Sequence, residues 1–270
     1  MPRPTAKFEV DTGKCGEWLK AYWQFWYAPD GGGYPTAPVL YAPAHGPQAW
    51  AWKAIALNAT DQVLDGLLGE ALNFSGQGAR PYLPTPDSPT TYRQFPSNDG
   101  GYNTFAWAAW VKHNTLIADQ ILIGHWHTDA RKAFKLVYDH ANTRYQFHAR
   151  TSGGTEVVAN GTTFGAPSTD QWNLVAGYYV GNGSSTGTEI GISVNGGAFD
   201  VQAISPTFVI NQSMSGIVSC IGSNASGSDA TLDAQLGGLF YWYGGVPGQQ
   251  ELKALYNSGR GSRLMVGVVT

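Results

Sequence analysis

The stretch Thr104-Phe-Ala-Trp-Ala-Ala-Trp-Val-Lys112 decides the fold, because aromatic and apolar residues without glycine or proline are typical of a strand. Similar runs recur on both sides of it, separated by turn residues. The runs that we expect to form strands are 21–26, 71–76, 104–112, 120–126, 132–139, 143–149, 156–159, 172–180, 189–195, 219–222 and 236–243. A sequence with so many expected short strands is typical of an all-β protein.

The composition supports the same conclusion. The chain has 35 Gly and 15 Pro, and only 13% of its residues are charged, whereas globular chains carry about 25%. The formal net charge is −3 and no Lys/Arg cluster occurs along the sequence, so we expect no nucleic-acid partner. No apolar run approaches the length that crosses a bilayer, and the first residues lack the apolar core of a signal peptide. We therefore expect no membrane insertion and no secretory signal in this sequence. Either the protein is not exported by a signal peptide, or a leader has been removed.

The runs divide the chain into one large domain with two extensions. We expect an N-terminal extension over 1–17, a single domain over 18–260 and an apolar tail over 261–270. The stretch 27–67 contains five of the 15 prolines and predicts a long irregular loop. One short helix is predicted after Pro247, with Leu252, Leu255 and Tyr256 on one face.

Two turns are predicted from their residues. The segment 139–142 is short and polar, so we expect a hairpin between the strands on either side of it. Asn195-Gly196 suits a type I′ turn, because both of its central residues need a positive φ.

Several of these segments, in this order, resemble the laminin-G-like jelly roll of the concanavalin A-like lectin/glucanase superfamily. The segments that carry the resemblance are Ala21-Tyr-Trp-Gln-Phe, Leu68-Gly-Glu-Ala-Leu-Asn-Phe-Ser-Gly, Thr104-Phe-Ala-Trp-Ala-Ala-Trp-Val-Lys, Trp172-Asn-Leu-Val-Ala-Gly-Tyr-Tyr, and Gly237-Gly-Leu-Phe-Tyr-Trp-Tyr with the helix that follows. The resemblance covers roughly residues 18 to 259. It implies a two-sheet antiparallel jelly-roll sandwich, concanavalin A-like, with one short C-terminal helix.

The hydrolases of this superfamily carry a Glu-x-Asp-x-x-Glu-like strand, because retaining glycosidases need two carboxyls on one face. The expected core strands 104–112, 132–139 and 172–180 contain one carboxylate, Asp139, at a hairpin turn. Glu9-Val-Asp11 lies outside the matched core, and Lys14 stands where the second Glu should be. From these residues we expect a protein that is not an enzyme.

Metal binding has two weak sets of candidates. His125 and His127 would share one face of an extended strand, with Asp129 close by, but the more common role of this position is a solvated strand end. Relatives bind calcium through acidic loops, and here the corresponding loop lacks carboxylates and Gly237-Gly238 replaces an acidic pair. Asp233 is then among the remaining calcium candidates. We expect no cofactor, with calcium as the alternative.

Aromatic side chains could stack on sugar rings or fill the core. We expect Trp107, Trp110, Trp172 and Trp242 in the core. The candidates for glycan stacking lie in loops or at strand ends, and they are Trp50, Trp52, Tyr82, Tyr92 and Trp126.

The apolar tail is a candidate for contact with a partner. Left free it would be prone to aggregation, so we expect it to pair with a sheet edge of its own or a neighbouring chain. Its partner-binding candidates are Leu264, Met265, Val266, Val268 and Val269. Cys15 and Cys220 are too few for a disulfide framework, and a bridge between them stays open.

Two functions follow from these expectations. The first is a structural or decoration protein on the surface of a phage or viral particle, in contact with other copies or with a shell protein. Its loops could also touch surface glycans. The alternative is a carbohydrate-binding or adhesion module of a cellular protein.

Overall fold

A computed structural model describes most of the second half of the chain and several shorter segments of the first half. The described residues are 104–127, 132–181, 187–205, 207–210, 220–222 and 231–259, together with strands at 7–10, 19–23, 53–55, 62–65, 69–75, 80–82 and 265–268. The domain boundaries that the sequence predicts near residues 17 and 260 lie outside the described residues. Among the described helices, none has the length and apolar character needed to cross a membrane.

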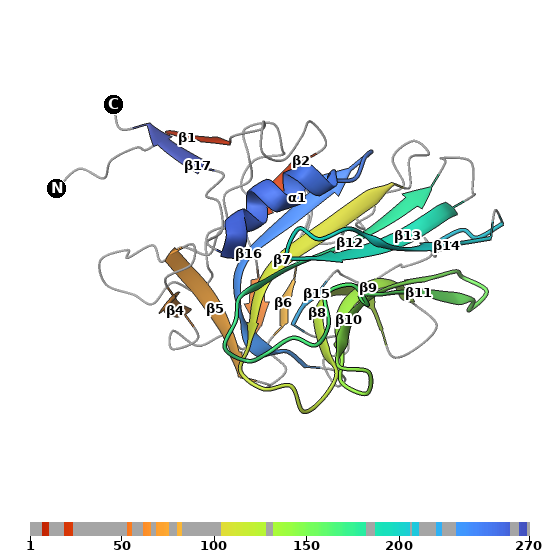
Figure 1. Ribbon diagram of the computed structural model, residues 1–270, viewed down its shortest axis with the longest axis horizontal. Helices are drawn as coiled ribbons and strands as arrows, with labels where there is room; N and C mark the ends of the chain where they lie inside the picture. Colours follow the sequence, from red (N-terminus) through yellow and green to blue (C-terminus); the bar gives the residue numbers. More distant parts are fainter. Residues whose placement is uncertain are drawn as a thin grey trace.

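Two antiparallel sheets face one another, as the sequence predicts (Figure 1). The strands of the first sheet, in spatial order, are β11 (Glu156–Asn160), β10 (Arg144–Arg150), β9 (Lys132–Asp139), β8 (Gln120–Trp126), β15 (Cys220–Ile221), β6 (Arg80–Tyr82) and β3 (Lys53–Ile55). Those of the second are β14 (Asp200–Ala203), β13 (Gly187–Val194), β12 (Asn173–Gly181), β7 (Phe105–His113), β16 (Asp233–Tyr243), β5 (Gly69–Ser75) and β4 (Gln62–Asp65), and β2 (Leu19–Trp23) also pairs with β16. We call them the β8–β11 sheet and the β7 sheet.

The prediction of an irregular loop over 27–67 is wrong in part, because β3 and β4 lie inside it. These strands have three and four residues. Such short strands give too few alternating positions for a period of two to be recognised in the sequence.

The core between the sheets is built from the inward side chains of both. On β7 these include Phe105 and Trp107, both 0% exposed. Phe134 of β9 packs against both of them, at ring-centroid distances of 5.0 and 6.3 Å. Phe147 of β10 lies beside Gly177 of β12, where an added Cβ would meet the Phe147 ring at 2.3 Å. The glycine therefore makes room for a large ring in the core.

The β7 sheet also buries its outer face, which the sequence did not predict. A second apolar cluster includes Trp110 and Trp242, both 0% exposed, and the partly buried Trp172. The helix α1 (Gln249–Tyr256) covers this face with Leu252 and Leu255. Three of the four predicted core tryptophans are thus fully buried, and two of these three lie beneath the helix rather than between the sheets.

The helix confirms its sequence prediction closely. It begins after Gly248, whose N–H donates to the Glu251 carboxylate at 2.6 Å. It ends at Asn257, which adopts a left-handed conformation with φ 46°. Tyr256 stacks on Trp110 of β7 at 5.8 Å, so the helix is fixed against the sheet.

Both predicted turns are present. Asp139 ends β9 and accepts a bond of 2.6 Å from the Asn142 side-chain amide in the hairpin to β10. Asn195 and Gly196 have φ of 56° and 68°, as a type I′ turn between β13 and β14 requires.

The two ends of the chain pair with one another. β1 (Lys7–Val10) and β17 (Met265–Val268) form an antiparallel two-stranded sheet, with Glu9 opposite Val266. The tail residues within β17 therefore pair with a strand of the same chain, one of the two arrangements expected. Leu264 and Val269 lie outside the described residues.

A chain of buried polar groups connects the two sheets. Gln120 donates through Nε2 to the Thr115 carbonyl at 2.6 Å, so its Oε1 must accept from the Asp233 N–H and from His113. His113 therefore carries its proton on Nδ1, and its Nε2 accepts from the Tyr145 hydroxyl at 2.9 Å. Burial lowers the pKa of His113 to about 4 despite the bond to Gln120 and the nearby charge of Asp233.

Candidate functional site

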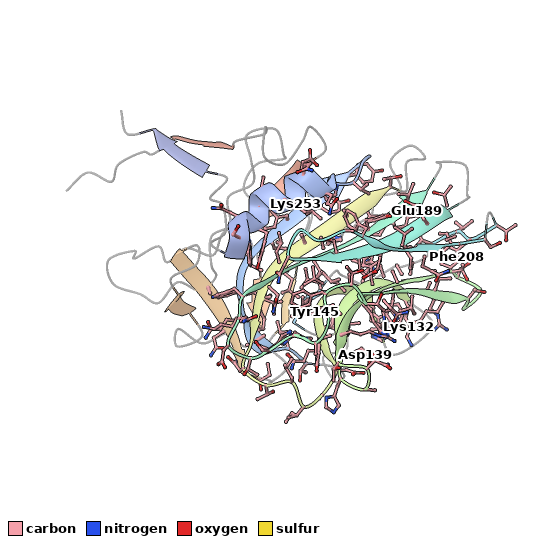
Figure 2. The ribbon with its side chains drawn as sticks, viewed as in Figure 1. Lys132, Asp139, Tyr145, Glu189, Phe208 and Lys253 are labelled. Atoms are coloured by element: carbon pink, nitrogen blue, oxygen red, sulfur yellow. The ribbon has the colours of Figure 1, made fainter. Side chains whose placement is uncertain are left out.

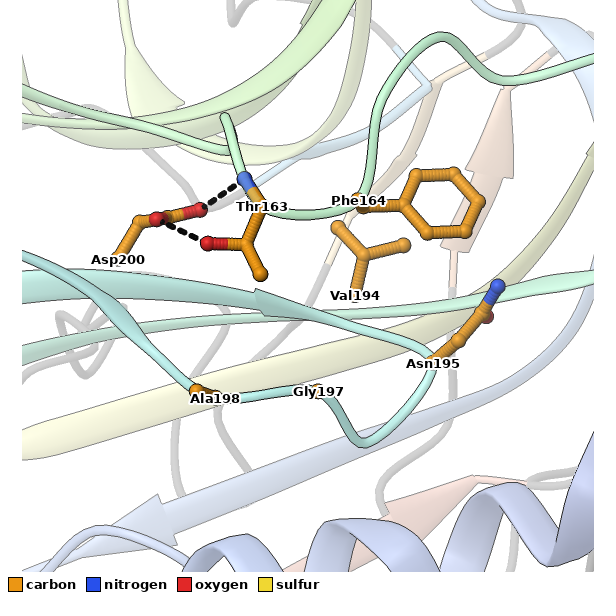
Figure 3. Close-up of a pocket in the computed structure, with 7 residues that line it drawn as sticks. All are labelled: Thr163, Phe164, Val194, Asn195, Gly197, Ala198 and Asp200. Carbon is orange, nitrogen blue, oxygen red and sulfur yellow. Dashed lines mark hydrogen bonds between the residues drawn. The ribbon is translucent and has the colours of Figure 1, made fainter.

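A cavity opens where the edge strands of the two sheets, β11 and β14, lie side by side. The segment after β11 supplies Thr163 and Phe164, and the β13–β14 connection with its flanking residues supplies the rest of the lining (Figure 3). Those residues are Val194, Asn195, Gly197, Ala198 and Asp200. The cavity has a volume of about 260 Å³, just below the usual range of about 300–1,000 Å³ for small-molecule pockets. It suits one small ring.

Asp200 fixes one wall of this cavity. Its Oδ2 accepts from the backbone N–H groups of Thr162 and Thr163 at 2.8 and 2.9 Å, and its Oδ1 accepts from their hydroxyls at 3.1 and 2.6 Å. Burial alone would raise the pKa of Asp200, but these four bonds outweigh burial and hold the pKa below its usual value. These four donors occupy the acceptor sites of the Asp200 carboxylate. Asp200 therefore holds the two sheet edges together.

Asn195 fixes the opposite wall. Its Oδ1 accepts the Leu174 N–H at 2.9 Å, and its Nδ2 donates to Asn173 Oδ1 at 3.0 Å, which leaves one amide hydrogen for other bonds. The turn next to it rests on α1, because a Cβ on Gly196 would lie 2.8 Å from the Lys253 Cα. The helix thus holds this wall in place.

The lining offers an apolar surface and fixed polar groups. Phe164 is partly buried and packs against the main core, and Val194 lies below its ring in Figure 3. The two threonine hydroxyls donate to Asp200, so their oxygens keep lone pairs that can accept bonds. Asp200 is the one ionisable residue of the lining. The cavity is therefore suited to bind a small polar ring through packing and hydrogen bonds.

Two of the predicted stacking residues are described, and neither belongs to this cavity lining. Trp126 ends β8 and is only 7% exposed. Tyr82 lies in β6 opposite Cys220. Trp50, Trp52 and Tyr92 lie outside the described residues, so their role stays a prediction.

The predicted metal candidates are not gathered into one site among the described residues. His125 is buried at 1% exposure, whereas His127, which follows the last residue of β8, is partly exposed. The carboxylate of Asp233 accepts from Asn114 at 3.0 Å and from Thr115 at 2.8 Å. Asp129 and Cys15 are outside the described part of the chain. Within that part, no group of three potential ligands forms.

Sequence reasoning missed the cavity residues because they come from distant segments. Thr163 and Asp200 are 37 residues apart, and only the pairing of sheet edges brings them together. The one local signal was Asn195-Gly196, which marks the turn but carries no information about what lies across from it.

Comparisons with known proteins extend the description of the fold. No protein-family model and no curated protein sequence matches the chain. Among solved structures, Trypanosoma rangeli sialidase in complex with the inhibitor DANA aligns over 90% of this chain and 34% of its own, with 15% identity and a TM-score of 0.56. The botulinum neurotoxin serotype D binding domain aligns over 90% and 52%, with 11% identity and a TM-score of 0.57. The binding domain of Paraclostridial Mosquitocidal Protein 1 aligns over 89% and 52%, with 10% identity and a TM-score of 0.57.

These similarities define the class as a β-sandwich shared by toxin binding domains and by sialidase structures. At such identities they establish the fold alone. The chain spans about a third of the length of the sialidases, at 34%, and about half of the toxin domains, at 52%.

The expectation that the protein is not an enzyme was wrong. It was drawn from the missing Glu-x-Asp-x-x-Glu strand, which belongs to one group of glycosidases. Sialidases are among the structures with a similar fold. The missing strand therefore excludes one catalytic arrangement, and it does not exclude enzymes as a class.

Proposed function

We propose that this protein is a glycan-binding β-sandwich module of the laminin-G-like kind, and that one sugar ring binds in the β11–β14 cavity. The observation that carries the proposal is the lining itself. It places a partly buried Phe164 ring beside fixed polar groups, Asn195 and the Thr163–Asp200 pair. Sugars present apolar C–H faces and many hydroxyls, so they match such a surface.

The fold comparisons agree with this proposal, but the proposal does not depend on them. Two of the similar structures are toxin binding domains, and another is a sialidase in complex with sialic acid. Each of those ligands and roles belongs to the named protein. The β-sandwich is a scaffold on which binding sites vary from protein to protein.

The test is a glycan array followed by titration of the best ligand. Phe164→Leu keeps an apolar side chain but removes the flat ring, and we expect roughly tenfold weaker binding from the loss of about 1.4 kcal/mol. Val201→Ala is the matched control, because Val201 is 53% exposed on β14 and does not line the cavity. Equal affinities of the wild type and Phe164→Leu would contradict the proposed site.

We also propose, as a second candidate, a structural role on the surface of a phage or viral particle, with neighbouring proteins as partners. The observation that favours it is the β1–β17 sheet, which is separate from the two large sheets among the described strands. Isolated two-stranded sheets are only marginally stable, and their free edges can accept a strand from another chain. Light scattering should then show association that is lost when residues 261–270 are removed. If the chain with residues 261–270 in place stayed monomeric, this role would be contradicted.

A further inference from the structure

Two lysine ammonium groups lie over a single indole ring on the outer face of the β8–β11 sheet. Nζ of Lys132 is 5.4 Å from the centroid of the Trp126 ring, and Nζ of Lys135 is 4.8 Å from it. The ring is almost fully buried, at 7% exposure. A sugar cannot stack on this ring in the way expected from the sequence unless the ammonium groups move.

The register of the strands explains why the three side chains meet. Trp126 lies opposite Lys132, and Lys135 lies opposite Gly124 on β8. A Cβ on Gly124 would be 3.1 Å from the Lys135 Cβ, so the missing side chain leaves room for the lysine. The register shifts between His125 and Trp126, so Trp126 lies opposite Lys132 and not opposite Ala133. The cluster is therefore produced by this irregularity in the pairing and by one glycine.

The carboxylate that attracts Lys135 most strongly, Glu156, already binds other groups. Glu156 of β11 accepts from His148 Nδ1 at 2.6 Å and from Arg150 at 3.3 Å. Within the described residues, neither Lys132 nor Lys135 has a carboxylate oxygen within 4.0 Å. The cluster is thus positively charged in a chain whose formal net charge is −3.

The groups that face the lysines from β10 do not neutralise them. The ring of His148 lies edge-on to Trp126 at 6.1 Å, and its Nε2 bonds to Gln146 Oε1 at 2.9 Å. Burial lowers the pKa of Lys135, and repulsion from Lys132 also lowers it. The attraction of Glu156, Asp119 and Asp139 acts in the opposite direction but does not restore the ordinary pKa. A bound anion would relieve this repulsion and leave the hydrogen bonds of Glu156 intact.

We propose that Lys132 and Lys135 bind the carboxylate or sulfate group of an acidic saccharide, with the Trp126 indole as the support for both ammonium groups. Charge-assisted hydrogen bonds from lysine to such oxyanions are among the stronger bonds at protein surfaces. That the anion belongs to a saccharide rests on the proposed function. Glu156 begins β11, and the segment that lines the cavity follows the other end of the same strand.

Binding of defined tetrasaccharides to the whole chain tests this site. Hyaluronan tetrasaccharide supplies carboxylates, chondroitin sulfate tetrasaccharide supplies sulfates as well, and N-acetylchitotetraose is the neutral counterpart. We expect both acidic probes to bind, with amide NMR shifts in β8 and β9, and the neutral probe to leave those amides unshifted. Lys132→Gln should weaken acidic binding roughly tenfold, and Lys132→Arg should restore most of it.

Lys253→Gln is the matched control, because it removes the same charge from exposed Lys253 on α1, on the other side of the sandwich (Figure 2). We expect its affinity to stay within about twofold of the wild type, since a distant exposed charge is screened by salt. An equal loss for Lys253→Gln and Lys132→Gln would overturn the site. Displacement of the acidic probes by a single-stranded oligonucleotide of equal charge would overturn its preference for saccharides.

The same titrations separate this inference from the proposed cavity. Loss of binding in Phe164→Leu with no change in Lys132→Gln would refute the lysine site and support the cavity. The reverse pattern would support the lysine site and refute the cavity. Failure of every tetrasaccharide to bind would refute this lysine site, and an array without any ligand would refute the proposed function as well.

Discussion

Acidification should destabilise the fold through His113, because this buried residue must be neutral. Its pKa is about 4 in the folded chain, and the ordinary value is 6.5. In this interval the unfolded chain binds the extra proton and the folded chain does not, so stability is complete above about pH 6.5 and falls as the pH drops toward 4. The difference amounts to about 3 kcal/mol in the free energy of unfolding by pH 4, at about 1.4 kcal/mol per pH unit.

Urea unfolding followed by tryptophan fluorescence at a series of pH values measures this dependence. Carboxylates titrate in the same range, so the quantity to compare is the difference between variants. His113→Gln should lower stability at neutral pH, but it should lose about 2.5 kcal/mol less than the wild type on going to about pH 4.5. Tyr145→Phe keeps the imidazole and should lose about 1 kcal/mol with a largely unchanged pH dependence. Parallel curves for the wild type and His113→Gln would refute the reasoning.

Two further predictions concern packing and the cavity. Gly177→Ala should cost about 1–3 kcal/mol in denaturant unfolding, because the new Cβ would meet the Phe147 ring at 2.3 Å, whereas Gly153→Ala, whose nearest contact is 3.8 Å away, should change stability by less than about 1 kcal/mol. A smaller cost at Gly177 than at Gly153 would contradict the packing described. Asp200→Asn should lower the melting temperature at neutral pH and bring it closer to the wild type at low pH, because a carboxyl with a lowered pKa stabilises the fold above its ordinary pKa and loses this effect as the pH falls. A difference in melting temperature that does not depend on pH would count against this role.

The strands were predictable where a run of apolar residues was long enough to show its pattern. The segment 104–112 forms β7 within one residue of its expected bounds. The side chains of β7 that point to either face of the sheet are mostly apolar. Trp107 and Trp110, for example, point to opposite faces. That pattern indicates burial on both faces of the strand. It does not show that α1 is the element that packs on the outer face. Burial of that face depends on tertiary packing of a helix that lies more than 130 residues further along the sequence.

The sites were less predictable than the strands, because they depend on which strands become neighbours. Trp126 was singled out as an aromatic residue at a strand end, and the register then placed Lys132 and Lys135 over its ring. The same holds for Asp200, whose partners follow a strand of the other sheet. A single sequence shows which residues are present, whereas the register of the paired strands determines which of them lie on the same surface.

Burial of the β7 sheet on both faces has a consequence for hydrogen exchange. The amides of β7 are bonded to β12 and β16 and covered on both sides, so they can exchange only when most of the molecule opens. β14 is an edge strand with exposed side chains, and its amides need only a local opening. The cavity wall at Asp200 can therefore open and close on a much faster timescale than the centre of the sheet, and a ligand held there would slow deuterium uptake in β14 while leaving uptake in β7 unchanged.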